Sequence, residues 1–363
     1  MKYGFNRINE IPVRTWRWLK VNYTSLSGEV EDSRETGATV KYIPDGFTVQ
    51  VFSELRPAAF QRIVPPPTGA ETALFVKENQ NTGFDIRLKR GVVQEEPLIL
   101  RVETSDDMAA VIENTRITIE QGSRGSVVFV IGSRTRKKTL YAGFTQVCVK
   151  ERAELKIVRI QNLDPAADAV SDLRAQIDAN AGCDVFLADL GAERSVSGCE
   201  IDLLGDSARS DLYSLYMGDG ERRLDMNYRV NFRAAATQGR IVAKGVLQDR
   251  SKKVFRDTLD FREGSRGATG REDETTLVLG SGAGNISVPL LLCAEDEISG
   301  EHATSSGKLD ENKIFYLMSR GLSYDDAKRV LVEGTFAEML ERIPDETLRG
   351  ELLEDIGRRL TLS

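Results

Sequence analysis

The sequence predicts an all-β body followed by a C-terminal α-helical domain, because the spacing of apolar residues changes once along the chain. From about residue 70 to 300, apolar and polar residues alternate in short runs rich in Val, Ile, Thr, Phe and Tyr, as in 126–131 and 240–247. A period of two is typical of β-strands. After Asp310 the spacing becomes about 3.6 residues, which is typical of helices.

The β-body is divided by turns rich in Gly, Asp, Asn and Ser, and its strands follow one another with almost no helical segment between 190 and 300. This pattern fits a sandwich, a barrel or a solenoid. No strict sequence repeat selects one of the three. Residues 280–284, Gly-Ser-Gly-Ala-Gly, are interpreted as a hairpin turn because a strand-like run follows them, whereas a dinucleotide-binding loop is followed by a helix.

The helical tail carries recognisable start and stop signals. Asp310 is a natural N-cap, and Gly321 stands where a glycine ends a helix. Ser323 and Asp326 form the pattern of a capping box that opens a second helix, and Pro344 precedes a third. The apolar stripes of these helices either pack within the protein or bind a partner.

We therefore divide the 363 residues into three parts: an N-terminal segment 1–70, a β-domain 71–305 and a helical domain 306–363. The N-terminal segment contains an Arg/Trp motif at 12–19, which includes Trp16, and it closes at three consecutive prolines that begin at Pro65. Proline runs interrupt regular structure and are common at boundaries.

Composition excludes several functional classes. There are 49 Lys and Arg against 56 Asp and Glu, so the formal charge is −7, and no basic tract is present. Nucleic acid is therefore not an expected partner. The N-terminus has no apolar signal-peptide core, and no run of 18 apolar residues occurs. We expect a cytoplasmic protein that does not cross a membrane and whose cysteines are reduced.

The chain contains one histidine, His302, and four cysteines at 148, 183, 199 and 293. A metal site with two histidines is thus excluded, and so is a Cys₄ cage, because no Cys-x-x-Cys occurs. If the protein takes part in a metal site, another chain must supply ligands. Composition alone favours an ordinary polar role for a single histidine.

No catalytic motif is present, and we expect the chain not to be an enzyme. Residues 300–309 fail as a Walker A loop because six residues separate the glycines and Leu309 replaces the Ser or Thr that binds magnesium. Asp257 and Asp260 could imitate the acid pair of a carbohydrate-active enzyme on a β-solenoid. We interpret them instead as part of a solvated strand face.

Residues 295–323, with Gly-Glu-His at 300–302 and Phe-Tyr-Leu-Met-Ser-Arg-Gly further on, resemble the C-terminal signature of the SufB/SufD family, and the likeness continues through 326–336. Residues 245–262 are similar to a strand pair of the family, and 12–19 to the N-terminal entry of SufD-type proteins. The resemblance implies a right-handed parallel β-helix followed by a helical domain.

The resemblance also implies a function. The chain would be a scaffold subunit of the SUF complex, in which the SufC ATPase drives iron-sulfur cluster assembly on a SufB and SufD pair. Helices from Asp310 onward would bind SufC, and the last strands would pair with a SufB-like chain. The alternative is a self-sufficient homodimeric, SufB-like scaffold that works with SufC alone.

Two departures from SufB favour SufD. Glu274 stands where SufB has a cysteine implicated in building the nascent cluster, and Glu301-His302-Ala303 replaces Glu-His-Glu. The resemblance implies that His302, in a small polar loop, is a ligand of a transient iron-sulfur cluster shared with the partner chain, and Glu301 is a second candidate donor. No cofactor is expected on the isolated chain.

Cys199 lies two residues before the position aligned with a sulfur-accepting cysteine of SufB, and two residues along a strand return to the same face. A sulfur-relay role for Cys199 is one hypothesis. A small buried apolar residue is the preferred interpretation, for Cys199 and for the other three cysteines.

Overall fold

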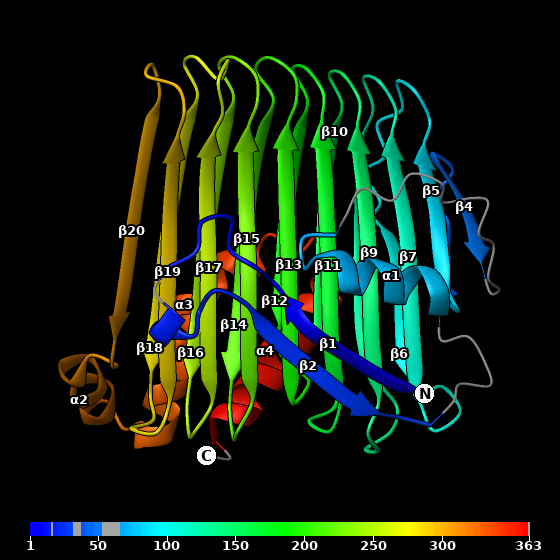
Figure 1. Ribbon diagram of the computed structural model, residues 1–363. Coiled ribbons are helices and arrows are strands. Elements are labelled where there is room, and N and C mark those ends of the chain that lie inside the picture. The colour runs from blue at the N-terminus through cyan, green and yellow to red at the C-terminus, as the bar shows by residue number, and fades with distance from the viewer. Residues whose placement is uncertain (16, 32–37, 53–65, 362–363) are drawn as a thin grey trace.

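The computed structural model describes residues 1–15, 17–31, 38–52 and 66–361, and its centre is a solenoid of parallel β-strands (Figure 1). Trp16 and Pro65, which belong to the two predicted N-terminal motifs, lie outside the described residues. The strands are β1 Lys2–Ile8, β2 Thr24–Glu29, β3 Ala38–Val40, β4 Phe47–Phe52, β5 Gly83–Leu88, β6 Leu98–Thr104, β7 Ala110–Ile119, β8 Arg124–Ser133, β9 Leu140–Val149, β10 Glu154–Asn162, β11 Asp168–Ile177, β12 Gly182–Asp189, β13 Arg194–Leu203, β14 Arg209–Gly218, β15 Arg223–Phe232, β16 Gln238–Leu247, β17 Lys252–Phe261, β18 Thr269–Val278, β19 Gly284–Cys293 and β20 Ser299–Gly307.

The solenoid consists of two nine-stranded sheets that face each other. Sheet C has the order β19-β17-β15-β13-β11-β9-β7-β5-β4, and sheet B has the order β20-β18-β16-β14-β12-β10-β8-β6-β3. Each coil contributes one strand to each sheet, and the coil is right-handed (Figure 1). Among the described strands of these two sheets, only β3 and β4, at the N-terminal end, pair antiparallel with their neighbours. The predicted all-β body with a helical C-terminus is confirmed as a parallel β-helix.

Residues 280–284 do not form the expected hairpin. They connect β18 in sheet B to β19 in sheet C, so they are a corner of the coil. Glycine and serine are common both in hairpin turns and in the corners of a solenoid. The two kinds of turn differ only in which strands the flanking strands pair with.

Coil length varies, although the strands pair in register. Residue 168 pairs with 194, one coil of 194 − 168 = 26 residues, whereas 252 pairs with 284, a coil of 284 − 252 = 32 residues. The variation falls in the corners and leaves the strands aligned. No fixed sequence period can therefore be read from the chain, which explains why repeat counting did not identify the solenoid.

One corner repeats its backbone conformation along most of the solenoid. From β5–β6 to β17–β18, each turn from a sheet C strand to the next sheet B strand contains a residue with positive φ, among them Arg152, Asn180, Ser207 and Ala236. The amide of each donates to a carbonyl of the following coil, as Ala236 N does to Arg266 O at 2.9 Å. This corner ladder satisfies backbone groups that would otherwise lie in a loop, and it offsets the strain of positive φ.

Replacing Ala236 by Gly is expected to stabilise the protein by about 0.5 to 1 kcal/mol, because φ is +55° there and glycine adopts that conformation without the Cβ clash. Urea unfolding followed by circular dichroism measures the change. The matched control is Ala234→Gly in the same turn, where φ is not positive and the substitution should give no gain. Equal effects of the two substitutions would contradict the strain argument.

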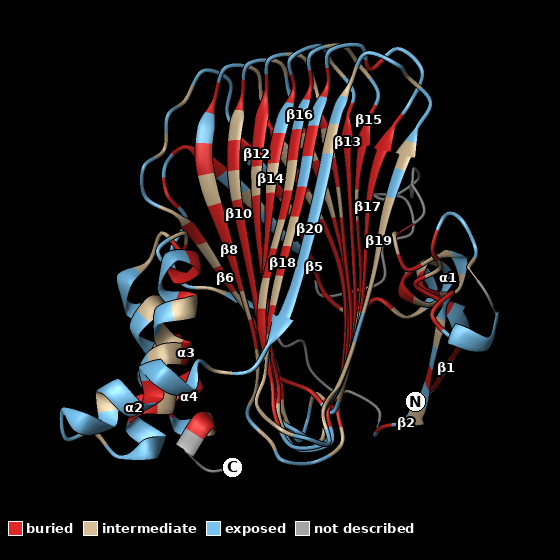
Figure 2. Cartoon of the chain, turned by 90° about the vertical axis from the view of Figure 1, so that its left-hand side faces the viewer, coloured by how far each residue is buried: buried red, intermediate tan, exposed pale blue. Residues whose placement is uncertain are grey.

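Three apolar clusters hold the layers together. The first fills the solenoid between the two sheets. The second lies between the outer face of sheet B and the C-terminal helices, and it includes Phe186, Leu215 and Phe336. The third lies between the outer face of sheet C and the N-terminal ribbon β1–β2 with helix α1 (Ala70–Asn79). Figure 2 shows the helices on one side of the solenoid and the N-terminal ribbon on the other.

The C-terminal helices begin as the sequence predicts. They are α2 Glu311–Ser319, α3 Tyr324–Leu340 and α4 Glu346–Thr361. The Asp310 carboxylate accepts from the amides of residues 312 and 313, and the Ser323 hydroxyl accepts from the Asp326 amide at 3.1 Å. Gly321, with φ +97°, follows α2. The predicted N-caps and terminal glycine are confirmed, whereas only half of the capping box is present, because the Asp326 carboxylate accepts from the Ser323 hydroxyl and not from its backbone amide.

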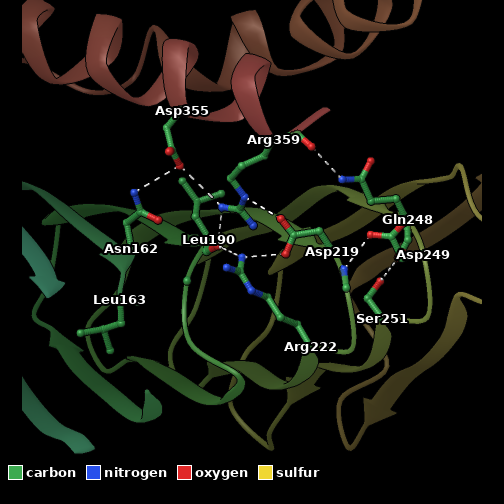
Figure 3. Close-up of polar contacts among 12 residues, drawn as sticks. Asn162, Leu163, Leu190, Asp219, Arg222, Gln248, Asp249, Ser251, Asp355 and Arg359 are labelled. Carbon is green, nitrogen blue, oxygen red and sulfur yellow. Dashed lines mark hydrogen bonds and ion pairs between the residues drawn. The ribbon is translucent and has the colours of Figure 1, made fainter. Parts of the chain in front are cut away.

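Helix α4 is fixed to the corners of sheet B by a polar network (Figure 3). Arg359 Nε donates to Asp219 at 2.7 Å, and its Nη1 donates to the Leu190 carbonyl at 2.6 Å. Arg222 donates to the same carbonyl at 2.7 Å. Burial, and then the Arg359 charge, lower the pKa of Arg222 to about 10. Asp219 compensates both guanidinium groups. Arg359 therefore ties α4 to the corners of two successive coils, at Leu190 and at Asp219.

Candidate interface site at the open end of the solenoid

The C-terminal end of the solenoid is open. Strand β19 pairs only with β17, and β20 pairs only with β18, so the other edge of each strand has no partner strand among the described residues. Figure 2 shows β20 exposed along its length. Natural proteins usually protect such edges, because unpaired backbone groups are a template for another strand. The open end is therefore the place in the fold that is suited to pairing with a second chain.

His302 lies on this edge. It is exposed, it belongs to β20, and it pairs in register with Glu272 of β18. The small polar stretch around it, expected to be a loop, is therefore a strand. The expectation was wrong because pairing with β18 satisfies the backbone of a Thr- and Ser-containing segment that carries no strong strand signal of its own.

Glu301 and His302 are consecutive on a strand, and their side chains therefore point to opposite faces. Glu301 lies 3.5 Å from the Arg271 guanidinium at the exposed surface. His302 shares the face of Glu272, which is the inner face of the solenoid. The two residues that the resemblance implies as ligands are thus separated by the pleat of β20.

A buried carboxyl pair lies beneath His302. Asp257 and Glu272 are both 2% exposed and come from β17 and β18, the coil before the last. Burial raises the pKa of Asp257 well above its usual value, and the neighbouring Glu272 carboxyl raises it further. The pKa of Glu272 is also raised, chiefly by burial. Two adjacent buried carboxyl groups favour a shared proton over two negative charges.

The interpretation of Asp257 and Asp260 as a solvated strand face was wrong, since both are buried. They lie three residues apart on β17 and so point to opposite faces. Asp257 faces the solenoid interior, whereas Asp260 faces outward and forms an ion pair with Arg262 at 2.6 Å. They cannot act together as an acid pair.

Glu274 also points inward, where it forms a fully buried ion pair with Lys253. The Tyr216 hydroxyl donates to the same carboxylate at 3.0 Å. Burial lowers the pKa of Lys253, and the Glu274 charge opposes that change. A buried ion pair of this kind is stable only with its partners in place. Glu274 is therefore engaged inside the last coils and does not project from the open end.

Among the described residues, no three His, Cys, Asp or Glu side chains come close enough to hold a metal ion. His302 can supply one imidazole nitrogen, and any remaining ligands for iron would have to come from elsewhere.

A family model described as the SufBD core domain of the SUF system for iron-sulfur cluster assembly matches residues 101–335, nearly two thirds of the chain. The chain belongs to the SufB/SufD family. The match covers most of the solenoid, together with α2 and most of α3.

Curated relatives agree with this family. The SufD protein of Bacillus subtilis is 24% identical over 285 residues, 77% of this chain and 64% of that protein. The SufB protein of the same organism is 24% identical over 78% of this chain and 61% of its own length. A SufBD family protein of Staphylococcus saprophyticus is 24% identical over 90% of this chain and 69% of its length. The chain thus spans about two thirds of these relatives. No described helix is long and apolar enough to cross a bilayer.

The cysteines of this SufB/SufD family member differ in exposure. Cys199 and Cys183 are buried within the solenoid, Cys148 is half-buried and Cys293 is exposed. The preferred interpretation of all four as buried residues is therefore wrong for Cys293, which stands at the end of the edge strand β19. Burial raises the pKa of the Cys199 thiol, which disfavours the nucleophilic thiolate. Sulfur relay through Cys199 remains a hypothesis.

The C-terminal helices of this family member expose a group of large apolar side chains. Phe315 is 74% exposed and Tyr316 is 56% exposed, and Met318 lies on the same helix, α2. Tyr324 and Val330 of α3 are also exposed. Helix α2 stands beyond the last coil, next to β20 (Figures 1 and 2). We call Phe315, Tyr316 and Met318 the α2 apolar patch. Contiguous exposed apolar side chains are characteristic of protein-binding surfaces.

The burial of the charged groups near the open end was not predicted from the sequence, although a signal was present. Lys253 and Asp257 lie on the same face of β17, and Glu272 and Glu274 lie on the same face of β18, because an even number of residues separates each pair. Charged residues at the period of the core face are unusual, because that face is normally apolar. To recognise these charged residues as buried, one must know which of the two alternating sets of positions on each strand faces inward, and that depends on the fold.

Replacing Asp257 by Asn is expected to stabilise the protein at neutral pH by on the order of 1 kcal/mol. A carboxyl with a raised folded pKa binds more protons in the folded than in the unfolded state, so its contribution to stability falls as pH rises above about 4. Asn is neutral throughout, and the variant should lose less stability over that range. Urea unfolding at several pH values tests this. Glu301→Gln is the exposed control, and a D257N variant less stable than wild type at neutral pH would refute the argument.

Proposed function

We propose that this chain is a SufD-like scaffold subunit of the SUF complex, not an enzyme, and that it presents His302 to a nascent iron-sulfur cluster at an interface with a SufB-like chain. The observation that carries the proposal is the position of the only histidine, exposed on the unpaired edge strand β20. The SufD-like assignment rests on Glu274, which stands in place of the SufB cysteine and is held inside by Lys253. We place this work in the cytoplasm, where the free cysteines would remain reduced.

Strand addition at the open end is the proposed mode of pairing. A partner strand would satisfy the free backbone edges of β19 and β20 and extend both sheets. Strand β19 also exposes Ile286 and Leu291, which would be covered by such a partner. The partner is a SufB-like chain in the main proposal. A second copy of this chain, forming a homodimeric scaffold with SufC alone, is the alternative.

In this proposal the iron-sulfur cluster is cargo, held only while it is assembled. The His302 side chain offers a neutral nitrogen ligand that suits iron, and the partner supplies the other ligands. Glu301 points to the opposite face of β20. It would be a ligand of the same cluster as His302 only if the cluster were bound at the edge of the strand, between the two faces. The Asp257–Glu272 pair would hold a proton close beneath the imidazole and keep the local negative charge low.

Replacing His302 by Ala should abolish cluster assembly in cells and leave folding and complex formation intact, because the exposed side chain makes no packing contribution. Assembly is measured by the activity of a cluster-dependent enzyme in a strain that relies on this gene. Thr304→Ala, also exposed on β20 and on the same face, is the matched control. Normal assembly with H302A, or equal loss with T304A, would overturn the assignment.

We further propose that the α2 apolar patch binds the SufC ATPase. Helices α3 and α4 bury their own stripes against sheet B, whereas Phe315 and Tyr316 of α2 remain open to solvent. Exposed aromatic residues of this kind contribute disproportionately to the binding energy at interfaces.

The double variant F315S/Y316S should weaken SufC binding by about 2 kcal/mol or more, which corresponds to at least about thirtyfold in Kd. Calorimetric titration of the full chain with SufC measures it. Tyr42→Ser is the control, because Tyr42 is 56% exposed, as Tyr316 is, but lies in the N-terminal segment. Unchanged SufC affinity in the double variant would show that the helices bind SufC elsewhere or not at all.

A further inference from the structure

The loop between β1 and β2 is held firmly over sheet C by buried polar groups. Arg256, which is fully buried, donates to the Val21 carbonyl at 2.5 Å and forms an ion pair with Asp225 at 2.6 Å. Asn227 donates to the Glu10 carbonyl at 2.9 Å. In Figure 1 this dark-blue loop crosses sheet C near β15 and β17. Breaking this buried ion pair would leave an uncompensated charge, so the contacts that hold the loop are costly to lose.

Asn22 closes the loop from within. Its side-chain oxygen accepts from the Thr15 amide at 2.7 Å, its side-chain nitrogen donates to the Thr15 carbonyl at 3.0 Å, and its own carbonyl accepts from Ile11 at 3.1 Å. The 3-10 turn η1 (Arg17–Leu19) lies inside this closure, and Lys20 follows with φ +55°. The outer surface of the loop is thus fixed in shape.

That outer surface contains a basic pocket of about 730 Å³. Its described lining residues are Arg7, Arg14, Thr15, Arg17, Lys20, Asn22 and Tyr23. Four of the seven are cations and none is an acid. Glu10, outside the lining, pairs with Arg7, and it lies 3.9 Å from Arg14. Among the described residues, Arg17 and Lys20 have no ion-pair partner.

Exposed cations are usually just solvated, and a solvated face is the ordinary interpretation of a basic cluster. Two features argue for more here. The protein carries a net charge of −7, yet four positive groups lie around this one pocket. The rigid loop holds them there against their mutual repulsion. The pocket is also concave and within the size range of ligand sites.

We propose that this basic pocket binds the phosphate groups of a multiply phosphorylated ligand. Arginine forks match phosphate oxygens in paired hydrogen bonds, and several cations around one cavity suit an anion with more than one negative charge. Tyr23 lines the pocket with Arg7 stacked on its ring, and Trp18, 73% exposed, lies on the same loop. The phosphate can belong to a soluble diphosphate or to a lipid headgroup. This site is independent of the proposed scaffold function.

The intrinsic fluorescence of the protein can report binding, because Trp18 lies on this loop and the only other tryptophan in the sequence, Trp16, falls between β1 and β2 along the chain. The full chain is titrated with inorganic pyrophosphate at physiological ionic strength, and tryptophan fluorescence is followed. We expect saturable binding that is weakened about tenfold or more in the variant R17A/K20A. The control K89A/R90A removes two exposed cations from another corner and should bind as wild type does. Circular dichroism verifies that each variant is folded.

A second arm uses vesicles of phosphatidylcholine with and without a phosphatidylinositol bisphosphate, whose headgroup carries more than one phosphate. Binding to the anionic vesicles alone, lost in R17A/K20A, assigns the phosphate to a lipid headgroup and supports the pocket. Binding of pyrophosphate assigns it to a soluble ligand. No saturable binding to either, or equal binding by R17A/K20A and wild type, overturns the proposal. Binding of poly-glutamate without pyrophosphate also overturns it and indicates an acidic protein partner.

Discussion

Every coil of this protein depends on the coil that follows it. The strands stack parallel and in register, and the corner ladder sends an amide of each coil to a carbonyl of the next, from Gly91 to Gly267. No single coil can satisfy its own backbone. At the N-terminal end, β3 and β4 run antiparallel and cover the first coil. At the C-terminal end nothing described does so, and the open edge is a direct consequence of the stacking rule.

The same rule explains the chemistry near the open end. Inward-facing side chains are dry only while another coil lies above them, so the Lys253–Glu274 ion pair and the Asp257–Glu272 carboxyl pair are covered by β19 and β20 alone. A carboxyl pair that shares a proton suits this intermediate position between core and solvent. His302 is the neighbour of Glu272 on the next strand, β20, and its side chain is on the same inner face. Solvent reaches His302, whereas Glu272 is buried.

Much of the fold was predictable from residues, and the reasons for the rest are physical. The change from β to α at Asp310 and the caps of α2 and α3 follow from local side-chain chemistry. The solenoid did not follow, because coil length varies and the positive-φ corner accepts Arg, Asn, Ser and Ala as well as Gly. His302 was found by composition and resemblance. Its strand, the separation from Glu301 and the buried acids beneath it depend on pairing register, which no local pattern encodes.

The placement of the two terminal segments leaves few surfaces for partners. The C-terminal helices cover part of the outer face of sheet B with the second apolar cluster, and the N-terminal ribbon covers part of sheet C with the third. Both sheets have therefore buried apolar outer faces within the chain. At the C-terminal end, the unpaired edges of β19 and β20 lie together with exposed apolar side chains of β19 and with the α2 apolar patch, whereas other exposed apolar side chains, Trp18 and Tyr42 among them, belong to the N-terminal segment. The outer faces of the solenoid are thus partly covered by its own terminal segments, whereas no described strand covers the edges of β19 and β20.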